Sequence, residues 1–141
     1  MINRRKFLLS SSSAFALSQL PGDVYAKNGI KRYKLVAKAA EHTFYPSAQK
    51  SKLSLYNQQS PGPIIHAVKD DILEVDFLNL LDEPTTIHWH GVRNLNEMDG
   101  VPGLTQPAVE SGETFTYRFP LNDTGLFWYH AHTQAWKQVT K

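Results

Sequence analysis

The sequence predicts an all-β protein, an antiparallel sandwich or barrel. Short segments in which apolar and polar residues alternate recur about every ten residues, and turns rich in glycine and proline separate them. No stretch of useful length after residue 27 has the helical period. Hydrophobic residues make up 41% of the 141 residues and aromatic residues 11%, which is enough for one packed core.

Residues 1–26 have the pattern of an export signal. Arg4, Arg5 and Lys6 precede an uncharged run from Phe7 to Leu20, and a small-residue cleavage site ends at Ala26. The paired arginines favour a twin-arginine signal, and an ordinary Sec signal is the alternative. We expect a mature chain, residues 27–141, in the periplasm or outside the cell. No later segment is apolar enough to span a membrane.

In the first half of the mature chain, alternation predicts three strands. They cover Tyr33–Ala39, Leu53–Tyr56 and Leu73–Phe77. Two prolines flank a glycine in Pro61-Gly62-Pro63, which indicates a turn. Extended structure is expected to resume from Ile64 to Val68.

The second half contains two strands that each carry a His-X-His pair, with another strand between them. The pairs lie in Thr86-Ile87-His88-Trp89-His90-Gly91 and in Phe127-Trp128-Tyr129-His130-Ala131-His132. Residues 92–107 are predicted to form a long loop, because glycine, proline and asparagine are spread through it. Alternation from Phe115 to Phe119 predicts the intervening strand.

The two histidine pairs predict a metal site. Side chains alternate between the faces of a strand, so the histidines of each pair share one face, about 6.5–7 Å apart. If the two strands are neighbours, four imidazoles converge on one patch, and imidazole is a preferred ligand of copper and zinc. Chance occurrence of the pairs within aromatic strands is the alternative. His42 and His66 stand alone: His42 is expected to be a surface residue rather than a ligand, and His66 to be structural.

Charge and cysteine content exclude several functions. Without residues 1–26 the chain keeps 12 of its 15 basic and 12 of its 13 acidic residues, so its balance gives no case for nucleic-acid binding. The chain has no cysteine, so it forms no disulfide. It also cannot build a blue-copper centre by itself, because that centre requires a cysteine thiolate.

From about Pro61 to His132 the chain resembles the first domain of the multicopper oxidases, the laccase-like family of cupredoxin (plastocyanin-like) domains. The residues that carry the resemblance are Pro61-Gly62-Pro63, Asn79, Thr86–Gly91, Met98-Asp99-Gly100-Val101-Pro102, Gln106-Pro107, Gly112, Phe115–Phe119 and Trp128–His132. The resemblance implies a cupredoxin-like Greek-key β-sandwich or barrel. We expect it to be incomplete at the C-terminal end, with residues 27–141 lacking the last strand of the domain.

The resemblance also implies roles for individual residues. His88 would bind the type 2 copper, His90 and His130 one type 3 copper, and His132 the other. Asp99 would assist proton delivery from beside the type 2 copper. Trp89, Trp128 and Tyr129 would pack around the site and orient the histidines.

In such oxidases one-electron oxidation of a substrate is coupled to reduction of dioxygen to water. A C-terminal cupredoxin domain supplies the other four histidines of the cluster and the type 1 copper. We therefore expect this chain to be the N-terminal part of an oxidase and to be inactive alone.

Two other functions compete with this interpretation. A zinc hydrolase can also use His-X-His on a strand, but no acidic third ligand follows His90 or His132 at short spacing. A non-catalytic copper-binding or structural cupredoxin fragment is the second alternative.

Overall fold

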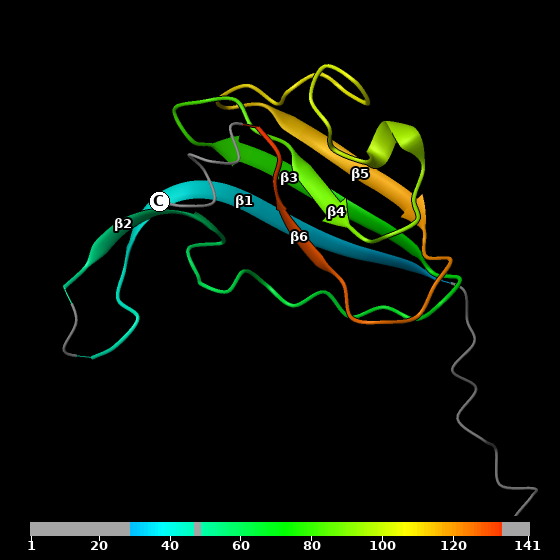
Figure 1. Ribbon diagram of the computed structural model, residues 1–141, viewed down its shortest axis with the longest axis horizontal. Coiled ribbons are helices and arrows are strands. Elements are labelled where there is room, and N and C mark those ends of the chain that lie inside the picture. Colours follow the sequence, from blue (N-terminus) through cyan, green and yellow to red (C-terminus); the bar gives the residue numbers. More distant parts are fainter. Residues whose placement is uncertain (1–28, 47–48, 134–141) are drawn as a thin grey trace, which may run out of the picture.

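The all-β prediction is confirmed by a computed structural model that describes residues 29–46 and 49–133. The described residues form six strands and one short 3-10 helix, η1, and the arrangement of the strands can be followed in Figure 1. Their bounds are β1 Ile30–His42, β2 Ser51–Tyr56, β3 Ile72–Leu80, β4 Ile87–His90, η1 Asn96–Met98, β5 Thr114–Pro120 and β6 Trp128–Ala131. The expected export signal lies outside the described residues. Within them, no helix has the length and hydropathy needed to cross a bilayer.

The larger sheet has the strand order β2-β1-β3-β5 and is not purely antiparallel. β1 and β3 are parallel, with Ile30 opposite Ile72, so the uniformly antiparallel prediction is wrong for this pair. The reason is the crossover from β2 to β3, which returns the chain to the starting end of β1. The buried carboxylate of Asp71 fixes that junction, because its two oxygens accept the N–H groups of Gly29 and Val68 at 2.9 Å each.

Part of this crossover is the stretch 64–68, which was expected to be extended and forms no strand. The hydroxyl of Tyr33 takes the place of a partner strand there. It donates to the carbonyl oxygen of His66 at 2.8 Å and accepts the His66 N–H at 2.9 Å. His66 is therefore held through its main chain, in keeping with the structural role expected for it.

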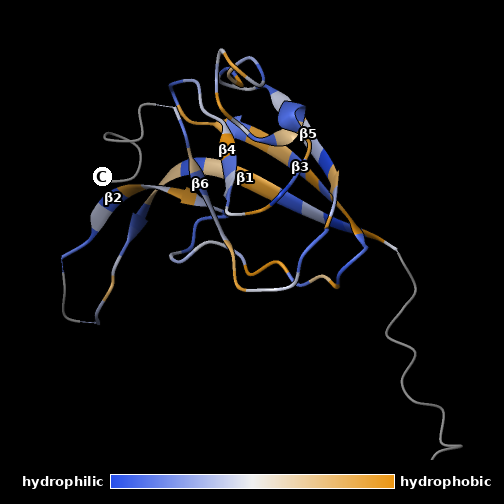
Figure 2. Cartoon of the chain, turned by 45° about the vertical axis from the view of Figure 1, so that its right-hand side comes forward, coloured by the Kyte–Doolittle hydropathy of each residue, from blue (hydrophilic) through white to orange (hydrophobic). Residues whose placement is uncertain are grey.

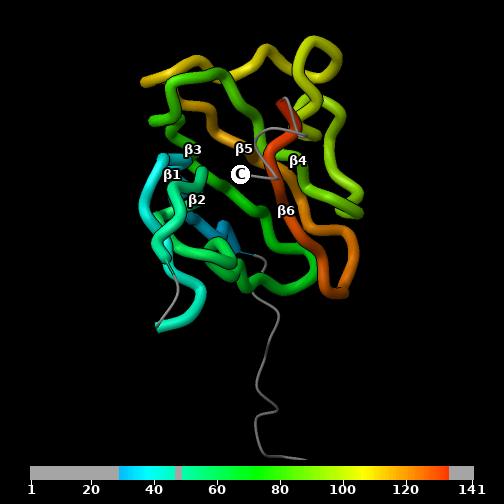
Figure 3. Tube along the Cα trace, turned by 60° about the vertical axis from the view of Figure 1, so that its left-hand side comes forward, coloured from blue at the N-terminus to red at the C-terminus, as the bar shows by residue number. Residues whose placement is uncertain are grey.

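Strands β4 and β6 form a two-stranded sheet that packs over the larger one (Figure 3). Trp89 of β4 contacts Tyr117 and Phe119 of β5, each with ring centroids 5.4 Å apart. Hydrophobic and hydrophilic residues alternate along the strands in Figure 2, which leaves each sheet one face for the core. The buried hydrophobic residues of this core are Leu35, Ala37, Leu73, Val75, Phe77, Leu81, Ile87, Trp89, Val109, Tyr117 and Phe119.

Two side chains from the larger sheet fix the position of β4. The amide of Asn79 donates to the carbonyl oxygens of Glu83 and Val109, both at 2.9 Å, and so closes the turn before β4. The hydroxyl of Tyr117 accepts the N–H of Ile87 at 2.8 Å. Because Ile87 directly precedes His88, these buried bonds set where the first histidine pair begins.

Candidate metal centre

The pairing of β4 with β6 brings the four predicted histidines to one face. His88 lies directly opposite His130, and Trp89 lies opposite Tyr129 on the other face. The ring centroid of His88 is 5.6 Å from that of His90, 5.3 Å from that of His130 and 5.2 Å from that of His132. The predicted patch required the two strands to be neighbours, and they are.

Three of these imidazoles can contact one ion. The ligand atoms of His88, His90 and His130 all lie within 4.8 Å of one another, and Nδ1 of His90 is 3.4 Å from Nε2 of His130. Metals bind neutral imidazole. Burial lowers the pKa of His130, and the neighbouring imidazoles of His88, His90 and His132 act in the same direction, against the Ala131 hydrogen bond. An all-nitrogen donor set of this kind suits copper or zinc, so the residues present fit the metal that the sequence predicts.

Two of the histidines are oriented by backbone carbonyl groups. Nδ1 of His88 lies 2.7 Å from the carbonyl oxygen of Asp99, and Nδ1 of His130 lies 2.8 Å from that of Ala131. An imidazole N–H that donates to a carbonyl leaves Nε2 as the free lone pair. Both rings are thus held in the tautomer that binds a metal through Nε2.

Asp99 lies beside His88, the histidine to which the family resemblance assigned it. Its carboxylate oxygen Oδ1 is 3.5 Å from Nδ1 of His88, and its side chain is 32% exposed. The closer contact is made by its main-chain carbonyl group, which no sequence pattern predicted. A side chain that contacts both His88 and solvent is placed to pass a proton between them.

Gly100 allows the loop to approach β4 this closely. It has a φ of +77°, and a Cβ added there would lie 1.8 Å from the carbonyl oxygen of Ile87. No other residue type fits this position without moving the backbone. The predicted loop 92–107 therefore contains a defined feature, η1 followed by Gly100, that sets the Asp99 carbonyl group against His88.

The three aromatic residues expected around the site divide between its two faces. Trp89 is buried in the core, and Tyr129 faces the same way and donates its hydroxyl to the carbonyl oxygen of Pro63 at 2.9 Å. Only Trp128 lies on the histidine face. Its ring centroid is 4.6 Å from that of His90 and 4.3 Å from that of His130.

The other two histidines of the chain lie outside the cluster. His42 contacts Phe44, with ring centroids 4.8 Å apart, and His66 lies in the crossover. Neither is in the group whose ligand atoms converge, within the ranges that the structure covers.

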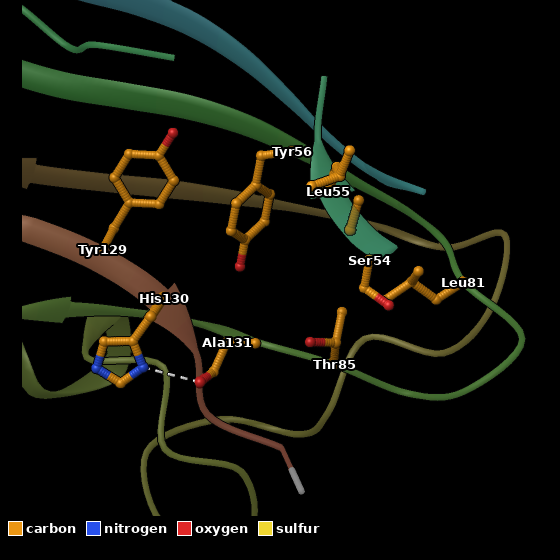
Figure 4. Close-up of a pocket in the computed structure, with 9 residues that line it drawn as sticks. Ser54, Leu55, Tyr56, Leu81, Thr85, Tyr129, His130 and Ala131 are labelled. Carbon is orange, nitrogen blue, oxygen red and sulfur yellow. Dashed lines mark hydrogen bonds between the residues drawn. The ribbon is translucent and has the colours of Figure 1, made fainter. Parts of the chain in front are cut away.

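A cleft of about 190 Å³ lies between β2 and β6, and His130 is part of its wall (Figure 4). The ring of Tyr56 lines it, 5.3 Å from that of Tyr129. The Tyr56 hydroxyl is buried without a hydrogen-bond partner in the described part of the chain, and burial raises its pKa. His130 and Tyr129 belong to the predicted site, but the cleft itself was not predicted, because β2 carries no residue type that signals it.

Comparison with known proteins gives one consistent family. Residues 38–141 match the family described as multicopper oxidase. Laccase-1 of Emericella nidulans is 49% identical over 84 residues, which are 58% of this chain and 14% of that protein. Multicopper oxidase MCE of Talaromyces pinophilus is 36% identical over 127 residues, which are 88% of this chain and 20% of that protein.

Solved structures of similar proteins agree. A multi-copper oxidase from Pseudomonas thermotolerans superposes with a TM-score of 0.74 at 42% identity, over 78% of this chain and 27% of that one. A blue copper oxidase from Nitrosomonas europaea gives a TM-score of 0.74 at 33% identity, over 79% and 35%. The chain therefore spans only a small part of these proteins, a fifth or less of the two curated relatives above.

Proposed function

This chain belongs to the multicopper oxidase family, with a cupredoxin-like fold, and we propose that it is the N-terminal copper-binding domain of an exported member. Residues 27–141 would form that domain. It would serve an oxidase that couples one-electron oxidation of a substrate to reduction of dioxygen to water. The observation that carries the proposal is the convergence of His88, His90 and His130 on one face of β4 and β6, with His132, the residue after β6, beside them.

Within the site, each histidine has its own role in the proposal. His88 would bind the type 2 copper through the Nε2 that its contact with Asp99 leaves free. His90 and His130 would share one type 3 copper, which the 3.4 Å between their facing nitrogens supports. His132 would bind the other type 3 copper. When bound, copper supplies the one-electron redox chemistry and the site for dioxygen.

Asp99 is proposed to hold and release protons beside His88. Reduction of dioxygen to water consumes protons, so a relay from solvent is required. The Asp99 carboxylate is partly exposed and lies 3.5 Å from Nδ1 of His88, which supports this role.

The other half of the proposed cluster must come from a C-terminal cupredoxin domain. This chain has 6 histidines and no cysteine, so it offers neither the remaining ligand set nor the thiolate of a type 1 copper. These counts also favour the second candidate, a copper-binding or structural cupredoxin fragment without turnover. Sequencing the source DNA past the codon for Lys141 separates the two. A downstream His-Cys-His stretch supports the oxidase, and an immediate stop codon supports the fragment.

Export by the twin-arginine route is the proposal for residues 1–26, which would place the domain in the periplasm or outside the cell. The Arg4-Arg5 pair before an uncharged segment supports it. Replacing both arginines with lysine should retain the precursor in the cytoplasm. Continued export of that variant, with loss of export when the Sec route is blocked, would overturn the assignment.

Copper titration of the full chain tests the site. Single His→Ala changes at the four proposed ligands should each weaken copper binding, and the spectrum of the bound ion should change. His42→Ala and His66→Ala remove an imidazole elsewhere and should leave binding unaltered. Equal loss from His42→Ala and His88→Ala would show that the ligand assignment is wrong.

A further inference from the structure

We propose that Trp128 is a positioning residue that holds the imidazole rings of His90 and His130 so that both face one metal ion. This inference rests on the proposed function of the same site. Trp128 lies directly opposite His90 in the β4–β6 register. Its indole stacks on His90 at 4.6 Å with an interplanar angle of 26° and lies 4.3 Å from His130 at 30°.

His90 has a particular need for such a contact. His88 and His130 each have Nδ1 bound to a backbone carbonyl oxygen. Among the described residues, the close nitrogen contact of the His90 ring is with His130 itself, at 3.4 Å. The ring torsion of histidine is broad, so an imidazole without an anchor rotates easily. Stacking against a large flat ring restricts that rotation without occupying either nitrogen.

Burial does not explain the position of Trp128. The residue is 55% exposed and is not part of the hydrophobic core. The side chains of β6 that point into the core lie on the opposite face of the strand, where Tyr129 is found. What Trp128 gains where it lies is contact with two imidazoles, and stacked aromatic pairs contribute beyond the area that they bury. The indole therefore lies against both rings of the His90–His130 pair.

Trp128→Leu, which keeps apolar bulk without a ring, is the central variant, and Trp128→Phe should restore most of the effect. Leu126→Ala is the matched control, because Leu126 is an exposed apolar residue, 101% exposed, two positions before Trp128. The first measurement is made on the metal-free full chain, by NMR of ¹⁵N-labelled histidine rings. The second is titration with cupric ion against a competing chelator.

In Trp128→Leu, the His90 ring should show a mixture of tautomers or exchange broadening that the parent chain and Leu126→Ala lack. Its affinity for cupric ion should fall about two- to tenfold, the range expected for one lost aromatic stack. Trp128→Phe should remain within about twofold of the parent. In the parent, stacking should shift the His90 ring protons upfield and give contacts between indole and imidazole protons.

Unchanged ring spectra and affinity in Trp128→Leu would overturn the inference. So would an equal loss in Trp128→Phe, because the ring would then be irrelevant. If Trp128→Leu does not fold, the test is the upfield shift of the His90 ring protons in the parent. The absence of that shift would contradict stacking by Trp128. The measurement without metal separates this inference from the proposed function. A parent that binds no copper while its His90 ring responds to Trp128→Leu would refute only the function.

Discussion

Nδ1 of His88 lies 2.7 Å from the backbone carbonyl oxygen of Asp99, closer than the 3.5 Å that separates it from the Asp99 carboxylate. The main chain therefore sets the tautomer of His88, and the carboxylate remains free for the proton transfer that we propose for it. This division of labour depends on the fit of Gly100 against β4, since Gly100 follows Asp99 directly.

Gly100→Ala should weaken copper binding at His88 and destabilise the fold. Gly103→Ala is the matched control, because Gly103 has the same φ of +77° but open space around its Cα. The control should cost about 1–2 kcal/mol of unfolding free energy from the left-handed backbone alone. Gly100→Ala adds the collision with Ile87, a further ~1–3 kcal/mol. Denaturant unfolding and copper titration measure both, and equal effects of the two changes would contradict the argument.

Only part of the geometry of the site could be predicted from the sequence. Strand alternation placed His88 with His90 and His130 with His132 because it needs only local backbone geometry. Their convergence required neighbouring strands, which Trp89 and Tyr129 secure by packing on the opposite face. The carbonyl contact of Asp99 could not be predicted, since it depends on a loop conformation that only the assembled sheet defines. The parallel pairing of β1 and β3 likewise depends on where the long crossover leads.

Trp128 shows a further limit. Hydrophobicity alone would assign this residue to the core, whereas its register puts it on the histidine face. The alternation that places His130 and His132 also places Trp128 with them. Strand alternation therefore predicted the face on which Trp128 lies, but the hydrophobicity of tryptophan predicted the opposite face.

Tyr117→Phe should destabilise the fold with little change in shape. The substitution removes the hydroxyl that accepts the N–H of Ile87 and leaves a buried donor without a partner. Such a loss costs about 1–3 kcal/mol. Tyr33→Phe removes a hydroxyl that makes exposed bonds to His66, which water can replace, so its cost should be smaller. The midpoints of thermal unfolding of the two variants give the comparison, and a larger loss in Tyr33→Phe would contradict it.

Acid should destabilise the fold partly through Asp71. The Val68 and Gly29 N–H groups lower the pKa of this carboxyl below its usual value of 3.8, and burial opposes them. A lowered folded pKa means that the contribution of Asp71 is full above the unfolded pKa and is lost as pH falls through the folded one. The melting temperature of the parent should therefore fall below about pH 4.

Asp71→Asn tests this contribution. The variant should be less stable than the parent at neutral pH, because its amide group faces an N–H donor, and the difference should shrink on acidification. Asp82→Asn removes a carboxylate on the surface and controls for net charge. A stability difference between parent and Asp71→Asn that stays constant from neutral pH to about pH 3 would refute the assignment.

The chain alone should not catalyse oxidation. Reduction of dioxygen to water takes four electrons, which must be stored and delivered together. The four histidines of the site supply half of the proposed cluster, and without a cysteine the chain has no type 1 centre to receive electrons. Copper held here would remain open to water on the face where His90 is exposed.

The full chain, loaded with copper, is assayed for oxygen uptake with a phenolic donor and with a cuprous salt. Free copper and the His42→Ala variant serve as controls. Sustained oxygen uptake at about 1 s⁻¹ or faster would overturn this prediction if His90→Ala abolishes it and His42→Ala does not.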